Sequence, residues 1–195
     1  MVFIFDENLT WHRQADDVIG KLSKSLYMMI NVKNFLPLHC RKKLYYSFFY
    51  SHLSRGILLW GTNISKPYIS KLQVKQIIAI RTIMKADYNS STSHFYKDLL
   101  ILNVDGIIKL ESCKLMYQVS NDKAPDVISQ IFKNQQHSHD TRFANDPQYN
   151  ERRNFAIVYN SFLSTAPQRY SLLPITVRNS TSIESFSKKC KKLFI

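Results

Sequence analysis

The chain has 195 residues and an apolar fraction of 45%, which is enough for a folded core in one domain or two small ones. It carries 27 Lys and Arg against 14 Asp and Glu, a formal net charge of +13. Four glycines are too few for the turns of a sheet sandwich or a dinucleotide-binding fold, and three distant cysteines fit neither a disulfide framework nor a paired-cysteine metal site. We therefore expect a helical protein of the nucleus or the cytoplasm, without a membrane span.

The first expected helix starts near Trp11. Its apolar residues recur at spacings of three and four, which is typical of one buried helix face: Ala15, Val18, Leu22, Leu26 and Met29. Lys21 and Lys24 fall outside this face, so we expect both on the outer surface.

Pro37 starts a second expected helix, which extends to about Leu59. Apolar and aromatic residues surround most of its circumference, so this helix should be the central and most buried one. Those residues are Leu44, Tyr45, Phe48, Phe49, Leu53 and Ile57.

A third helix is expected from Pro67 to Met84, after a break at 61–63. Its apolar face comprises Ile69, Leu72, Ile77, Ile80, Ile83 and Met84. A basic stripe should lie on the opposite side, formed by Lys71, Lys75, Arg81 and Lys85. A single core should join the three helices through Trp11, Leu22, Leu26, Phe48, Leu53, Leu72 and Ile80.

The second half is less basic and less regular. Helices are expected at 93–100, at 107–119, after Pro125 and at 182–193, with a possible short strand at 156–159. The fold class is therefore mainly α. A three-helix, thumb-like bundle occupies residues 1–90, and a smaller helical region occupies 91–195, with a long polar loop at about 134–154.

The positive charge is concentrated in one segment. Between Val18 and Ala86 there is no Asp or Glu, whereas there are twelve Lys and Arg, so the rest of the chain holds 27 − 12 = 15 basic against 14 acidic residues. An ordinary solvated surface mixes both signs, and a segment without carboxylates repels itself unless an anion lies nearby. A phosphate backbone is the first candidate anion and an acidic membrane surface is the second.

We expect phosphate contacts from the basic residues of the three helices, with an RNA–DNA or DNA duplex as the partner. The proposed contact residues are Lys21, Lys24, Arg41, Lys42, Lys43, Lys71, Lys75, Arg81 and Lys85. The aromatic run at 45–50 offers base-stacking surfaces, although its helical spacing favours core packing. The lysines at 188–192 are either a second phosphate contact, a nuclear localisation patch or cations favoured at a helix end.

Catalytic and metal sites have little support. The His137–Asp140 stretch reads as a solvent loop rather than a metal site, because no cysteine is near it. No serine lies in a nucleophile motif, so a hydrolase triad has no support. We expect no catalytic residue, no metal and no cofactor in this chain.

Several stretches together carry a resemblance to a known family. They are Asp6–Trp11; Tyr45–Ser47 with Ser51–Leu53 and Trp60–Gly61; Lys71–Gln73 with Ile80–Arg81; His139–Arg142; and Leu173–Pro174 with Val177–Arg178 and Ser182–Lys189. In this order they resemble the region that follows the catalytic palm in reverse transcriptases of jockey-type non-LTR retrotransposons. The resemblance covers nearly the whole chain. The Trp-Asn pair that usually precedes the Leu-Pro in this family is absent.

The resemblance implies a truncated or fragmentary RNA-directed DNA polymerase that lacks the palm and fingers and keeps a thumb that binds the template–primer duplex. The palm's metal-binding carboxylates are absent, since the pair Asp16–Asp17 lies within the first expected helix. As it stands, this chain is therefore not expected to polymerise DNA. The alternative is a non-catalytic helical interaction or scaffold protein whose basic face binds an acidic protein or a membrane.

Overall fold

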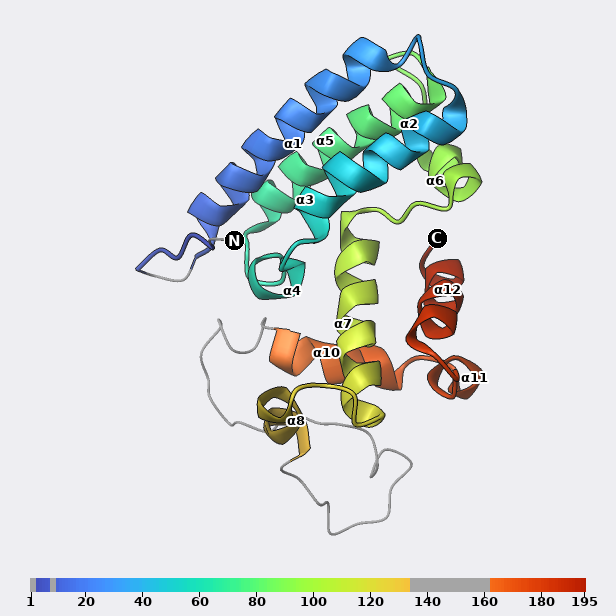
Figure 1. The fold of residues 1–195 in the computed structure, drawn as a ribbon. Coiled ribbons are helices and arrows are strands. Elements are labelled where there is room, and N and C mark those ends of the chain that lie inside the picture. Colours follow the sequence, from blue (N-terminus) through green and yellow to red (C-terminus); the bar gives the residue numbers. More distant parts are fainter. Residues whose placement is uncertain (1–2, 8–9, 134–161) are drawn as a thin grey trace. The chain divides into compact units, whose positions relative to one another are not determined.

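The structure is a computed structural model that describes residues 3–7, 10–133 and 162–195. All regular elements in these ranges are helices, which confirms the mainly α fold class (Figure 1). The chain divides into two compact units, Met1–Ile107 with Ile195 and Ile108–Phe194. The expected strand and the expected polar loop at about 134–154 lie outside the described residues.

Three helical segments form the body of the first unit (Figure 1). They are α1 (His12–Val32); the continuous run of α2 (Leu38–Leu44), the π-helical η1 (Tyr45–Tyr50) and α3 (Ser51–Ser54); and α5 (Lys66–Met84). Each segment packs against the other two. The short α4 (Ile57–Trp60), α6 (Ser93–Leu99) and the first turn of α7 (Val104–Ser120) complete the unit.

The second helix ends earlier than expected. Arg55 leaves the helix with a ψ of 109°, and Gly56 adopts a left-handed conformation with a φ of 60°, which glycine reaches without a steric penalty. The indole of Trp60 donates a hydrogen bond of 2.9 Å to the freed Arg55 carbonyl. The helix predicted to extend to Leu59 is therefore two helices with a sharp break between them.

The π-helical turn changes which aromatic side chains are buried. Tyr45, Phe49 and Leu53 are fully buried, at intervals of four residues, whereas Phe48 is 43% exposed. The wider π turn adds a residue to each turn, so every fourth position stays on the inner side and Phe48 rotates outward. The expectation that Phe48 belongs to the core was wrong. The other six residues named for that core are buried.

A buried polar network fixes the end of the first unit to α5. The amide nitrogen of Gln76 donates to the Tyr45 hydroxyl at 2.9 Å and to the Leu102 carbonyl at 2.8 Å. Gln73 donates to the Tyr96 hydroxyl at 2.8 Å and accepts from the Val104 backbone at 3.1 Å. Because these bonds hold residues 96–104 against α5, the first unit extends to Ile107 instead of ending at residue 90.

The second unit packs around aromatic and thiol side chains. It contains most of α7, together with α8 (Asp126–Lys133), α10 (Phe162–Ser171), α11 (Ile175–Arg178) and α12 (Ile183–Phe194). Tyr117 and Phe186 stack with their ring centroids 4.5 Å apart, and the Tyr117 hydroxyl donates to the Ser180 carbonyl. Cys113 and Cys190 are fully buried.

The exposure of the two neighbouring phenylalanines gives a direct test of the π-helical register. We expect Phe49→Ala to lower the free energy of unfolding by about 3–5 kcal/mol, because it empties a fully buried site. Phe48→Ala removes a half-exposed ring and should cost about 1 kcal/mol. Urea denaturation measures both values, and equal losses would contradict the register.

Thiol reactivity tests the core of the second unit. Burial raises the pKa of Cys113 to about 12, with a smaller contribution from Cys190, and raises the pKa of Cys190 to about 11. Both thiols therefore stay protonated at pH 8 and react slowly. In the native chain we expect a disulfide reagent to modify half-buried Cys40 quickly and the other two only on unfolding. The fast phase should disappear in Cys40→Ser, and fast modification of all three would contradict the packing.

Candidate nucleic-acid interface

The nine proposed contact residues do not form one surface. They lie toward both ends of the three-helix body, and one of them is buried. Lys71 and Lys85 are 14 positions apart, which is about 21 Å along an α-helix. The burial and the neighbouring charges of each residue therefore decide whether its cation is available to a ligand.

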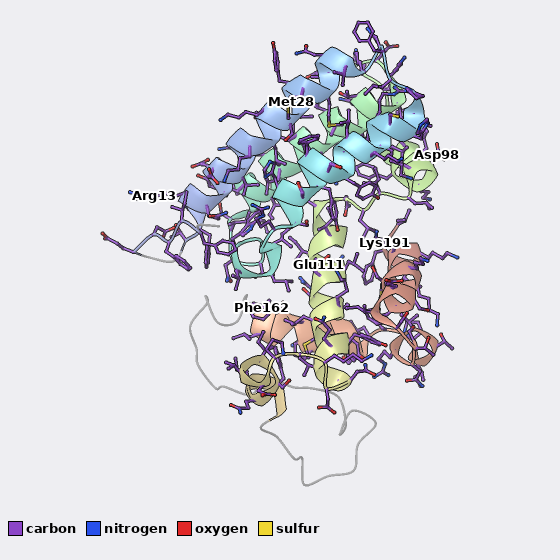
Figure 2. The ribbon with its side chains drawn as sticks, in the orientation of Figure 1. Arg13, Met28, Asp98, Glu111, Phe162 and Lys191 are labelled. Carbon is purple, nitrogen blue, oxygen red and sulfur yellow. The ribbon has the colours of Figure 1, made fainter. Side chains whose placement is uncertain are left out.

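At the N-terminal end of α1, cations lie beside carboxylates. Lys21 forms an ion pair with Asp17. The ammonium of Lys71 lies 4.7 Å from the centroid of the Tyr68 ring, and the Tyr68 hydroxyl bonds Asp16 at 3.2 Å. Figure 2 shows Arg13 at this end of α1 and Met28 farther along the helix. The nearby Asp16 and Asp17 reduce the positive potential here.

Arg41 is buried, which sequence analysis did not foresee. It is 8% exposed, and its Nη1 donates a long bond of 3.5 Å to the Thr82 carbonyl in the last turn of α5. Its Nε is buried and has no hydrogen-bond partner in the described part of the chain. Arg41 occupies the same inner side of the helix as Tyr45 and Phe49. Arg41 therefore does not lie at the surface with the other proposed contacts.

The opposite end of the body gathers cations with fewer carboxylates. We call this surface the basic tip: the loops 33–37 and 85–92 with the ends of α1, α2 and α5 that they adjoin (Figure 1). Lys85 is exposed, and its ammonium lies 3.4 Å from the Asn34 carbonyl, which joins the two loops. Asp87 is the only carboxylate in these loops.

Arg81 is half-buried and supports the second loop of the basic tip. Its Nε and Nη2 donate to the Ser90 carbonyl at 3.1 and 2.9 Å, and its guanidinium carbon lies 5.5 Å from the centroid of the Tyr88 ring. The expected exposed stripe on α5 is therefore incomplete, because Lys71 and Lys85 are exposed whereas Lys75 and Arg81 are half-buried.

The other three proposed contact residues lie on α1 and α2. Lys24 is exposed on the outer side of α1. Lys43 is exposed and Lys42 is half-buried on α2, one to two residues after the buried Arg41. Lys42 and Lys43 thus lie in α2 beside the basic tip, and Lys43 is the more accessible of the two.

The pKa of His52 reflects the surrounding positive charge. It is lowered first by desolvation and then by the positive charges of Arg55 and Lys21, whereas Asp17 raises it.

The helix dipole also favours cations at the basic tip, because α1 and α5 both end there with their carbonyl groups. The dipole is a sufficient structural reason for Lys33 and Lys85 at these ends.

Sequence analysis missed two aromatic side chains at the basic tip. Phe35 is 86% exposed and Tyr88 is 81% exposed. Neither lies in a periodic helical pattern, so no spacing singled them out. Their positions next to helix ends, between Lys33 and Leu38 and shortly after Lys85, were the available signal.

A second cationic feature lies on α12. A hollow of about 270 Å³ is lined by Ser182, Glu184, Ser185, Lys188, Lys189 and Lys192. Glu184 offsets one positive charge, and the Lys189 ammonium donates to the Thr176 carbonyl at 3.0 Å. Both contacts reduce the positive charge that this hollow offers to an anion.

Comparisons of the chain with protein-family models, with curated proteins and with solved structures find no match. In the ranges that the structure describes, no helix combines the length and hydropathy needed to cross a bilayer. The same ranges hold no cluster of three His, Cys, Asp or Glu that would ligate a metal. The His137–Asp140 stretch lies outside them.

The burial of Arg41 leads to a prediction about stability. A buried cation without a carboxylate keeps most of its desolvation cost, and an apolar side chain of similar length avoids that cost. We expect Arg41→Met to be at least as stable as the parent in urea denaturation and to bind duplex as tightly. Lys42→Met is the matched control and should bind less tightly. Equal losses of affinity in both variants would place Arg41 at the interface.

Proposed function

We propose that this chain binds nucleic-acid duplex through phosphate contacts and derives from the post-palm region of a non-LTR reverse transcriptase. The proposal assigns binding, and no catalysis, to the chain. The observation that supports it is the charge of the first unit: twelve cations between Val18 and Ala86 without one carboxylate. Folding gathers several of them at the basic tip.

Phosphate contacts fit the chemistry of these side chains. Lysine and arginine neutralise phosphates and release condensed counterions, which gives affinity that depends on salt and not on base sequence. The length of α5 from Lys71 to Lys85 matches several phosphate steps of a duplex. A helix lying along the duplex would therefore contact more than one phosphate.

The rival function is an interaction module for an acidic protein or an acidic membrane surface. The same cations would serve either partner, so charge alone does not separate the two functions. Binding to anionic lipid vesicles or polyglutamate, tested beside duplex at matched salt, distinguishes them. We favour nucleic acid because the basic tip also carries exposed aromatic rings, on which the bases of nucleotides can stack.

Charge reversal at the basic tip tests the proposed function. For the parent, the logarithm of affinity should fall linearly with the logarithm of salt concentration, by about 0.9 per phosphate contacted on B-form DNA. Lys42→Glu with Lys43→Glu should weaken binding equally for unrelated sequences and make this slope shallower by about 1.8 for two lost contacts. Lys71→Glu with Lys75→Glu should weaken binding less, because the Tyr68 ring already engages Lys71 and the Tyr68 hydroxyl brings Asp16 near. Fluorescence anisotropy measures each affinity.

The control is Arg55→Glu with Lys66→Glu, which makes the same change in net charge at exposed positions at the end of α3 and the start of α5, the end of the three-helix body opposite the basic tip. It should bind nearly as well as the parent. Exposed charges contribute little to folding, so all variants should unfold at similar urea concentrations. A control that loses as much affinity as the tip variant would show that binding follows net charge only. A parent that binds no duplex at low salt would overturn the proposed function.

A further inference from the structure

We propose that Phe35 and Tyr88 form a stacking platform for unpaired nucleobases, so that the basic tip recognises single-stranded extensions beside a duplex. This inference rests on the proposed nucleic-acid binding and names the part of the ligand that the basic tip takes. It follows from the exposure of the two rings, their common location and the charge around them.

The exposure of these rings is unusual within the chain. Phe35 and Tyr88 are the two most exposed of the large hydrophobic aromatic side chains that the structure describes, at 86% and 81%. Single exposed apolar side chains are common on protein surfaces and need no function. Here both rings lie on loops at the same end of the three-helix body.

The two loops are tied to each other and to the helices. The Lys85 ammonium bonds the carbonyl of Asn34, the residue before Phe35, at 3.4 Å. The Ser90 amide donates to the Asp87 carbonyl at 3.1 Å, which forms a turn around Tyr88. The Lys85 and Ala86 amides bond the Thr82 and Arg81 carbonyls, which closes the end of α5.

Tyr88 is supported from behind. Arg81 donates two bonds to the Ser90 carbonyl, and its guanidinium lies 5.5 Å from the Tyr88 ring centroid. This contact orients the ring while 81% of the residue stays exposed. An oriented ring loses little conformational entropy when a base stacks on it.

The combination of rings and cations defines the ligand. Aromatic side chains stack on the faces of bases, whereas the cations around them bind the phosphates between those bases. Bases inside a duplex are stacked on one another and present no free face, so the platform requires unpaired nucleotides. Lys33 and Lys85 begin the two loops that carry the rings, Lys42 lies on α2 after the first loop, and Asp87 is the one carboxylate in the two loops.

The experiment compares two ligands that share one duplex. The first is a blunt RNA–DNA duplex, and the second carries an extension of unpaired nucleotides containing 2-aminopurine, whose fluorescence falls on stacking. The full chain is titrated with each ligand at the same salt concentration. We expect tighter binding of the extended duplex and quenching of the reporter base.

Removing the rings should abolish only this preference. Phe35→Ala with Tyr88→Ala should lower affinity for the extended duplex by about thirtyfold or more, since each ring is expected to stack one base, and should restore the fluorescence. Its affinity for the blunt duplex should stay within about twofold of the parent. Phe5→Ala is the aromatic control, because Phe5 is 61% exposed and precedes the opposite end of α1. It should retain the preference, and thermal melting confirms folding of every variant.

The outcomes separate this inference from the proposed function. Equal binding of blunt and extended duplex by the parent would overturn the platform and leave phosphate binding intact. Equal losses in the double variant and in Phe5→Ala would also overturn it. Binding of neither ligand, with binding of polyglutamate or anionic vesicles, would overturn both proposals.

Discussion

Mutual repulsion among twelve cations without one carboxylate is the constraint on which the first unit depends. Folding brings the helices of this segment together, so each charge must reach water, a carbonyl group or a flanking carboxylate. Lys21 reaches Asp17, which precedes the segment in sequence, and Lys85 reaches a backbone carbonyl of the neighbouring loop. The first unit therefore retains a positive field that an external polyanion would relieve.

Helix ends organise what remains of that charge. The C-terminal carbonyls of α1 and α5 give the basic tip two partially negative ends, which attract Lys33, Lys85 and the buried Arg41. Neutral hydrogen bonding does the internal positioning, through Gln76 and Tyr45, whose hydroxyl pKa is raised by burial. The internal hydrogen bonds are thus made by neutral side chains, and the exposed lysines are not needed for packing of the core. The helix dipoles can therefore favour cations at these ends while the same cations bind phosphate.

The sequence predicted the helices better than the details that place the site. Spacings of three and four located α1 and α5 because both are regular α-helices with one buried face. The same rule failed at Phe48, since a π-helical turn has a different period, and at Arg41, since charge was read as exposure. The rings of the basic tip were missed because loop residues have no period and their exposure depends on tertiary structure. The proposed phosphate contacts themselves stay a prediction.

The most direct test of the account is photochemical cross-linking of the full chain to an RNA–DNA duplex with an unpaired extension, followed by mass spectrometry of the adducts. Because cross-links form between groups in contact, the map locates the ligand without any substitution. We predict adducts in loops 33–37 and 85–92 and on α2, and their loss at high salt. Adducts confined to α12, or none above an unrelated helical protein, would contradict the assignment of nucleic-acid binding to the basic tip.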